Sequence, residues 1–296
     1  MYTADISRIN PACFLFLIDQ TGSMSQRFGL SEQTKAEALA DAVNRMLSNL
    51  VIRCTKEDGV RNYFHCGMVG FGRSVEPLGP AWEGALAGRT IVPISEIALQ
   101  PLRIADRQIS VADGAGGLQG AWVRLPTWVE PRAELGQPAP GHHNLIARAC
   151  DLARSLLEPW VCEHPNGFPP TVVLVTDGGE EGGDPVEAAE RLKNVATADG
   201  NTLLYCCHIS AVALPPIMFP DTDDRLGDAY ARMLFRMASS LPQTISSHLR
   251  SSEMALGESP RGFAFNADVG ALIRFLDIGT RVADLVDLRP RRWEKG

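Results

Sequence analysis

The sequence predicts an α/β fold: a doubly wound, mostly parallel open sheet with helices on both faces. Five apolar runs are short enough to be buried strands, and four of them lack the polar alternation of a strand with one wet face. Helical patterns separate the runs, and such alternation is typical of a parallel sheet. The runs cover residues 13–18, 63–71, 171–176, 202–209 and 262–265.

Between and after these runs, apolar residues recur at intervals of three and four, which is the spacing of one helix face. Asp184 and Pro185 open one of these segments as the capping residue and the proline of the first turn. The predicted helices cover residues 36–50, 145–157, 186–196, 226–237 and 269–276.

Residues 75–140 break this alternation, because the interval is rich in proline and glycine. We expect an irregular β-rich insertion or edge elaboration there, with β-like pieces at 89–94 and 121–129 and no core helix. Trp122 and Trp128 are either contacts for a partner protein or members of a small local core.

The chain of 296 residues is expected to form a single domain over 1–296, with a helical elaboration at 222–259 between the last two core strands. Hydrophobic residues make up 45% and charged residues 21%, which is ordinary for a soluble globular protein. The formal net charge of −7 argues against nucleic acid or an anionic membrane as the main partner.

The sequence is expected to belong to a cytoplasmic protein with no membrane association. No run approaches the ~20 apolar residues that cross a bilayer, and residues 1–10 hold Asp5 and Arg8 without an apolar stretch of signal-peptide length. The seven cysteines are odd in number and lack C-x-x-C spacing, which argues against a disulfide framework or a zinc site.

Oxygen-bearing side chains follow two of the predicted strands. Asp19, Thr21 and Ser23 lie on alternate positions directly after the run at 13–18, and Asp177 follows the run at 171–176. Ligands of open α/β sheets gather at the carboxyl ends of the strands. If the two strands are neighbours, both carboxylates are therefore expected to point into one crevice.

This set of side chains favours a hard divalent cation. Two carboxylates with hydroxyls suit Mg²⁺, or Mn²⁺ or Ca²⁺, better than Zn²⁺ or Cu²⁺. They leave positions for water, and a carboxylate from another molecule can take one of these positions. The alternative for Asp19 alone is that it caps the following helix.

These motifs resemble the von Willebrand factor type A (VWA) domain and its metal-ion-dependent adhesion site (MIDAS). The family motif D-x-[ST]-x-S matches Asp19, Thr21 and Ser23, and the later strand-end aspartate of the family matches Asp177. The resemblance implies a Rossmann-like sheet, a bound Mg²⁺ and a non-catalytic adaptor that binds an acidic residue of a partner. Similarity to stand-alone bacterial VWA proteins further implies a phosphatase or kinase partner encoded nearby, in a stress, signalling or defence system.

The chain departs from this family at the third element, a threonine in a loop between the two motifs. His143 stands where the threonine is expected, and Asn144 follows it. The Asn144 oxygen could substitute as a ligand, His143 could favour a softer ion such as Mn²⁺, or the ion could be weak or absent. Alternatively, Asn144 only caps the helix that follows.

Two other functions stay open. A Mg²⁺-dependent phosphohydrolase would use Asp19 as its nucleophile, but such enzymes usually carry a second acid where this chain has Thr21, and a lysine that is missing between Thr171 and Arg191. The other alternative is a metal-free VWA scaffold that binds partners through the 75–140 interval, which the departure at His143 favours.

Overall fold

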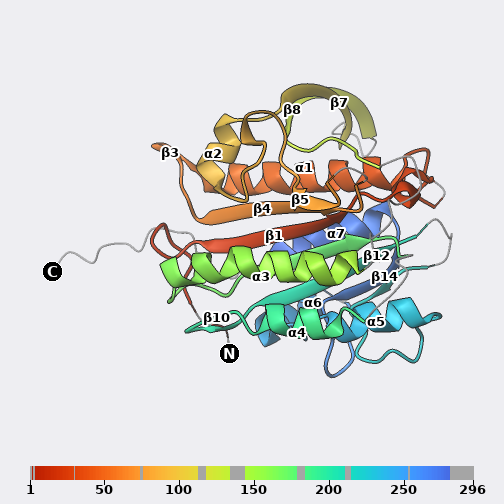
Figure 1. Ribbon diagram of the computed structural model, residues 1–296. Coiled ribbons are helices and arrows are strands. Elements are labelled where there is room, and N and C mark those ends of the chain that lie inside the picture. The colour runs from red at the N-terminus through yellow and green to blue at the C-terminus, as the bar shows by residue number, and fades with distance from the viewer. Residues whose placement is uncertain are drawn as a thin grey trace.

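The computed structural model describes residues 2, 4–29, 31–73, 76–112, 118–133, 144–178, 184–210, 215–252 and 254–280, without the side chains of 107–112, 118–123, 279 and 280. Within these ranges the centre is an eight-stranded sheet with helices on both faces (Figure 1).

Five parallel strands form the middle of the sheet, in the order β14-β12-β9-β1-β4. They agree with the five predicted runs, so the predicted α/β class with a mostly parallel sheet is confirmed, while VWA or Rossmann-like specifics are not. The strands are β1 (Ala12–Asp19), β4 (Phe64–Phe71), β9 (Thr171–Thr176), β12 (Leu203–Ile209) and β14 (Phe263–Ala267).

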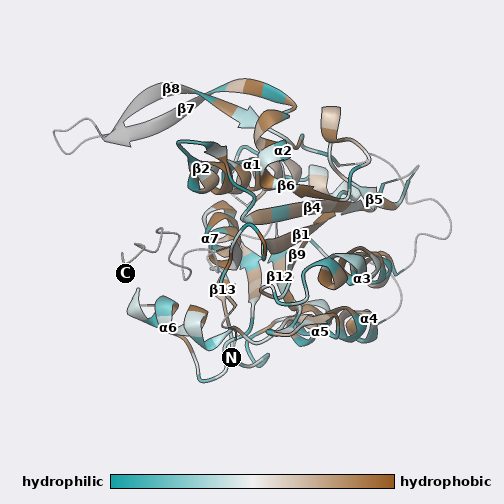
Figure 2. Cartoon of the chain, turned by 90° about the vertical axis from the view of Figure 1, so that its left-hand side faces the viewer, coloured by the Kyte–Doolittle hydropathy of each residue, from teal (hydrophilic) through white to brown (hydrophobic). Residues whose placement is uncertain are grey.

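Two apolar cores lie on the two faces of this sheet. Successive residues of a strand point to opposite faces, so in β1 Phe14 and Phe16 join one core while Leu15 and Leu17 join the other. The first core contains α1 (Lys35–Cys54), α6 (Gln243–Ser251) and α7 (Val269–Thr280). The second contains α3 (Leu145–Glu163), α4 (Val186–Lys193) and α5 (Ala229–Met237). Figure 2 shows α1 and α7 on the opposite side of the sheet from α3 and α4.

The start of α1 is fixed by a capping box. The Thr34 hydroxyl accepts from the Glu37 backbone N–H, and the Glu37 carboxylate accepts from the Thr34 N–H at 2.7 Å. Two backbone donors that the helix leaves open are thereby satisfied. Lys35 is consequently the first residue of the helix.

The segment between β4 and α3 adds antiparallel strands and a hairpin. Two short strands pair with β4, and the long hairpin forms a separate two-stranded sheet above α1 (Figure 1). The expectation of no core helix in this interval is wrong, because a six-residue helix buries Ile94 and Ile97. The elements are β5 (Leu78–Pro80), η2 (Gly84–Leu86), β6 (Ile91–Pro93), α2 (Ile94–Leu99), β7 (Arg103–Ala112) and β8 (Leu118–Thr127).

The remaining short strands are β2 (Thr55–Lys56), β3 (Gly59–Val60), β10 (Ala196–Thr197), β11 (Gly200–Asn201) and β13 (Ile217–Met218). All seven cysteines are free thiols; Cys162 is exposed and the other six are buried. In the part of the chain that the structure describes, no helix combines the length and the apolar character that a membrane span requires.

A histidine at the start of β4 is held neutral by its surroundings. The Trp160 indole N–H donates to Nδ1 of His65 at 3.0 Å, and the ring of His164 lies 5.5 Å from that of His65. Burial, reinforced by the charge of His164, lowers the pKa of His65 to about 4. The unfolded chain therefore binds a proton at His65 more readily than the folded protein does.

We predict that the free energy of unfolding falls as the pH drops from about 6.5 to about 4, by about 2 kcal/mol after allowance for the partial exposure of His65. Urea unfolding followed by circular dichroism across this range measures the loss. His65→Gln should remove this part of the pH dependence, whereas His248→Gln, at the end of α6, should keep it. Equal profiles for His65→Gln and the unmodified protein would contradict the prediction.

Candidate functional site

The candidate site lies next to the point where the order of the parallel strands along the sheet reverses, between β1 and β9. β1 pairs with β9, and β4 lies on one side of β1 while β9, β12 and β14 follow on the other. In open α/β sheets, ligand sites form at the carboxyl ends of the strands beside such a reversal. Asp19 ends β1, and Asp177 directly follows β9.

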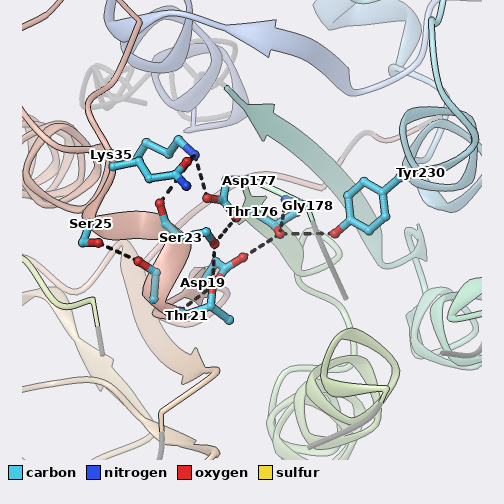
Figure 3. Close-up of polar contacts among 11 residues, drawn as sticks. Asp19, Thr21, Ser23, Ser25, Lys35, Thr176, Asp177, Gly178 and Tyr230 are labelled. Atoms are coloured by element: carbon cyan, nitrogen blue, oxygen red, sulfur yellow. Dashed lines mark hydrogen bonds and ion pairs between the residues drawn. The ribbon is translucent and has the colours of Figure 1, made fainter. Parts of the chain in front are cut away.

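Four side chains form a continuous chain of hydrogen-bonded oxygens at this point (Figure 3). Oδ1 of Asp19 accepts from the backbone N–H of Thr21 at 2.9 Å and from its hydroxyl at 2.7 Å. The hydroxyls of Thr21 and Ser23 are 2.9 Å apart, and the Ser23 hydroxyl donates to Oδ1 of Asp177 at 2.8 Å. We call Asp19, Thr21, Ser23 and Asp177 the oxygen cluster. The structure thus brings together two motifs that are 154 residues apart.

A turn of 3₁₀ helix, η1 (Gly22–Ser25), shapes the loop that carries the hydroxyls. Its Met24 is buried, which anchors the loop to the core beneath it. Ser25 does not join the oxygen cluster, because its hydroxyl donates back to the carbonyl of Gly22 at 2.7 Å.

Lys35 completes the site, and the sequence patterns do not predict it. Its Nζ donates to Oδ2 of Asp177 at 2.8 Å and to Oε1 of Gln26 at 3.0 Å. The side chains of Lys35 and Asp177 are only 5% and 1% exposed, so this ion pair is buried. A lysine in the first turn of a helix opposes the helix dipole, and this unfavourable position is the signal that a carboxylate partner is near.

The oxygen cluster carries more negative charge than Lys35 neutralises. Two carboxylates against one ammonium leave one net negative charge in a buried place. Burial and the charge of Asp177 raise the pKa of Asp19 to about 6, although hydrogen bonds from Thr21 and Thr176 oppose the rise. A further cation would therefore stabilise this site.

A second set of residues supports the oxygen cluster from the side of β9 and β12. The Thr176 hydroxyl donates to Oδ2 of Asp19 at 2.7 Å and lies 3.2 Å from the Tyr230 hydroxyl. Gly178 has φ +89°, and a Cβ there would lie 3.2 Å from the Tyr230 ring. Burial lowers the pKa of His208, whose ring stacks on Phe265 at 5.1 Å. This side of the site is largely aromatic.

The two residues predicted as a third element fare differently. Asn144 stands at the N-cap position of α3 with φ 59°, and it is exposed. The predicted capping position is thus confirmed, and the Asn144 carbonyl accepts from the Arg148 N–H at 3.0 Å, but the side chain makes no capping hydrogen bond. Among the described residues, none of the hydrogen bonds that link the oxygen cluster involves Asn144. His143 lies outside the described residues.

The spacing and chemistry of the oxygen cluster fit a small divalent cation. An octahedron with metal–oxygen bonds of about 2.1 Å has edges of about 3.0 Å. The oxygens of Asp19 and Thr21 are 2.7 Å apart and those of Thr21 and Ser23 are 2.9 Å apart, which is close to such edges. Carboxylate and hydroxyl oxygens are also the donors that Mg²⁺ and Mn²⁺ prefer.

Close approach of β4 to the loop requires glycine at position 72. Gly72 has φ +93°, and a Cβ there would clash with Cγ2 of Thr21 and lie 2.9 Å from its backbone nitrogen. Gly72→Ala is predicted to lower the free energy of unfolding by about 2–4 kcal/mol and to displace Thr21 from Asp19. Urea unfolding measures the first effect.

Gly88→Ala is the matched control for this change. Gly88 also has a positive φ, +77°, but no atom lies within 4 Å of its Cβ position. This variant isolates the backbone strain and should lose only about 1 kcal/mol. Equal losses in the two variants would show that contact with Thr21 contributes nothing.

Comparison with known proteins does not identify a family. No family model matches the chain, and no curated protein matches it. Among solved structures, the pilus adhesin SpaC from Lactobacillus rhamnosus GG is 11% identical over 94% of this chain and 32% of its own length, with a TM-score of 0.46. The PilB minor pilin from Streptococcus sanguinis is 12% identical over 67% of this chain and 57% of its own length, with a TM-score of 0.29. The chain thus spans about a third of the adhesin and somewhat over half of the pilin.

Three expectations from the sequence are corrected. The identification as a VWA protein, including the stand-alone bacterial group, is withdrawn, because no family model matches the chain. The identification of a MIDAS is withdrawn with it: in the described ranges no three His, Cys, Asp or Glu side chains gather to hold a metal. The expected cytoplasmic location is also withdrawn, because it followed only from missing apolar segments and cysteine spacings, and such absences do not establish where a protein resides.

Proposed function

We propose that this chain is a non-catalytic protein-interaction module whose binding face is the oxygen cluster at the carboxyl ends of β1 and β9. A divalent cation held there receives an acidic side chain of a partner protein. The observation that carries this proposal is the unbroken chain of oxygens from Asp19 to Asp177, buried with one net negative charge. An interaction role is consistent with the descriptions of the matched structures, an adhesin and a pilin.

The residues have distinct roles in this proposal. Asp19, Thr21 and Ser23 would hold Mg²⁺, Mn²⁺ or Ca²⁺ directly, and Asp177 would hold it through water. A divalent cation would change the net charge of the site, Lys35 included, from one negative to one positive. A positive face of this kind attracts the carboxylate of an Asp or Glu side chain.

The surroundings of Asp19 argue against a role as a phosphohydrolase nucleophile. Both of its oxygens accept hydrogen bonds, Oδ1 from Thr21 and Oδ2 from Thr176. The residue two positions on is Thr21, whose hydroxyl is tied to the same carboxylate, so no second acid stands there to act on a leaving group. A binding role uses these residues better than a covalent one.

The proposal is tested by calorimetry with Mg²⁺, Mn²⁺ and Ca²⁺, followed by a peptide that presents one exposed glutamate. We expect cation binding, and peptide binding only when the cation is present. The same peptide with glutamine in place of glutamate is the matched control and should not bind. The absence of cation binding, or peptide binding that survives EDTA, would overturn the proposal.

A metal-free module that binds through the 75–140 interval is the second candidate. A groove of about 250 Å³ separates α1 from the base of the hairpin, with Glu37 and Asp41 on one side and Arg103 and Glu130 on the other. Arg103 and Glu130 form an ion pair with two hydrogen bonds on that side of the groove, at 2.7 and 3.2 Å. Partner binding that resists EDTA and is lost in Arg103→Ala would favour this candidate.

A further inference from the structure

We propose that Lys35 is a resident cation of the oxygen cluster: its ammonium closes the site when no divalent ion is bound, and the ion must displace it from Asp177. This inference rests on the proposed function, because it concerns how the same site is loaded. It gives the binding face two states, one held by Lys35 and one held by the ion.

The contacts of Lys35 place its charge inside the site. Its Nζ lies 2.8 Å from Oδ2 of Asp177, while Oδ1 of the same carboxylate takes the Ser23 hydroxyl at 2.8 Å. Both oxygens of Asp177 are thus engaged from within the protein (Figure 3). An ammonium at this position provides the compensation that a buried carboxylate needs and that a bound cation would otherwise supply.

The remaining contacts of Lys35 provide a path along which its ammonium can move from Asp177 towards solvent. Nζ also donates to Oε1 of Gln26 at 3.0 Å and lies 3.5 Å from the carbonyl of Ser23. Gln26 is exposed, so these acceptors lead from the buried carboxylate towards solvent. The stem of a lysine has four flexible carbons, and the ammonium can leave Asp177 while it stays near Gln26.

The backbone of Lys35 does not need to move for this exchange. The capping box of Thr34 and Glu37 fixes the first turn of α1 independently of the lysine side chain. A lysine in this first turn opposes the helix dipole. Its position is therefore explained by the charge of Asp177 and not by the needs of the helix.

Charge repulsion determines how the Lys35 ammonium changes the affinity of the site for a divalent ion. An ammonium and a divalent cation that share one carboxylate repel each other at short range, so the ammonium lowers the affinity for the ion. If the ammonium is removed, ion binding should tighten and the ion-free protein should lose stability. A lysine with only a structural role would give the second effect without the first.

The test compares Lys35→Met with Lys35→Arg, which keeps the charge, and with Lys193→Met as a matched control. Lys193 pairs with Glu190 at 2.6 Å on α4, away from the site. Calorimetry with Mg²⁺ and Mn²⁺ measures affinity, and thermal unfolding in EDTA and in saturating Mg²⁺ measures stability. In Lys35→Met we expect roughly tenfold tighter ion binding. The midpoint of thermal unfolding in EDTA should be lower by roughly 5–15 °C than in the unmodified protein. Saturating Mg²⁺ should restore most of this lost stability.

Lys193→Met should bind the ions within a few-fold of the unmodified protein, and Lys35→Arg, which keeps the positive charge beside Asp177, should not show the tighter ion binding of Lys35→Met. If Lys35→Met folds only when Mg²⁺ or Mn²⁺ is present, the expected result is met in its strongest form. Unchanged or weaker ion binding in Lys35→Met, or failure to fold with and without the ions, overturns the role of Lys35 while the proposed function stands. If the unmodified protein and Lys35→Met both fold and bind no ion, the proposed function fails as well.

Discussion

Asp19→Asn is expected to weaken cation binding strongly and, in the absence of the cation, to make the protein more stable. The folded protein raises the pKa of Asp19 to about 6 through burial and the charge of Asp177. The ionised form is therefore disfavoured in the fold at neutral pH, by roughly 2–3 kcal/mol relative to the unfolded chain. Asparagine removes this charge and keeps the side-chain oxygen that accepts from Thr21.

The two effects of Asp19→Asn have opposite signs, which makes the result easy to interpret. A divalent ion loses a charged ligand, so the dissociation constant for Mg²⁺ should rise roughly a hundredfold or more. Urea unfolding in EDTA at pH 7.5 should meanwhile show a gain of about 1–2 kcal/mol, less than the full electrostatic term because the contact with Thr176 is rebuilt. Calorimetry and unfolding on one preparation measure both.

The pH dependence gives a further check on Asp19. A carboxyl whose pKa is raised in the fold contributes stability that is complete below its unfolded value, about 4, and is lost as the pH rises through about 6. Asp19→Asn should remove this loss. His65 acts in the opposite direction over nearly the same range, so the difference between variant and unmodified protein isolates Asp19.

Asp58→Asn is the matched control for this series. Asp58 is an aspartate whose side chain is 58% exposed, in a surface ion pair with Arg61. Its replacement should leave cation affinity unchanged and have little effect on stability, because surface ion pairs contribute little. Wild-type cation affinity in Asp19→Asn would contradict the assignment of Asp19 as a ligand.

The oxygen cluster could be predicted from the sequence because two of its residues follow the ends of predicted strands. Asp19 and Asp177 follow buried apolar runs, and parallel strands place their carboxyl ends at one edge of the sheet, so their meeting follows from the fold class. Thr21 and Ser23 follow from alternate spacing in one short loop. The positions of these two hydroxyls could be predicted because they depend on local sequence and not on contacts with distant residues.

Lys35 could not be predicted in the same way. Its contact with Asp177 joins residues 142 positions apart and depends on where α1 begins and how that helix meets the loop. The helix α2 was not predicted for a different reason: its six residues are too few to show a helical period. Asparagine is a common capping residue, but Asn144 has the left-handed backbone conformation that asparagine tolerates. No sequence pattern predicts this conformation.

Trp128 resolves one alternative that the sequence left open. Trp128 is 1% exposed, and its indole N–H donates to the carbonyl of Ile97 at 2.6 Å, so it does not lie on the surface. It packs in the main core that contains α1 and not in a small core of its own. The side chain of Trp122 lies outside the described residues. The residues after β8 are therefore packed against the body of the protein, and one side chain of α1 forms hydrogen bonds with their backbone.

That side chain is Asn44, and Asn44→Ala is expected to lower the free energy of unfolding by about 3–4 kcal/mol. Its Oδ1 accepts from the backbone N–H groups of Trp128 and Val129 at 2.7 and 3.1 Å, and its Nδ2 donates to the Val129 carbonyl at 2.8 Å. Alanine would leave three buried backbone groups without partners, and each costs about 1–3 kcal/mol. Urea unfolding measures the loss.

Two further variants separate the parts of this effect. Asn44→Asp keeps the acceptor for both N–H groups but turns an oxygen towards the Val129 carbonyl, so its loss should be comparable to that of alanine or larger. Asn201→Ala, at an exposed asparagine of β11, should cost less than about 0.5 kcal/mol. A loss below about 1 kcal/mol in Asn44→Ala would mean that the backbone of residues 128 and 129 finds other partners.

The same variant connects the insertion to the binding face. Val129 and Glu130 line a small cavity together with Asp19 and Gln20, so the segment that Asn44 holds borders the strand end that carries the site. If Asn44→Ala releases this segment, water gains access to that side of Asp19, and the burial that raises its pKa is reduced. The pH at which Asp19 affects stability should then shift down in Asn44→Ala, whereas in Asn201→Ala it should stay where it is in the unmodified protein.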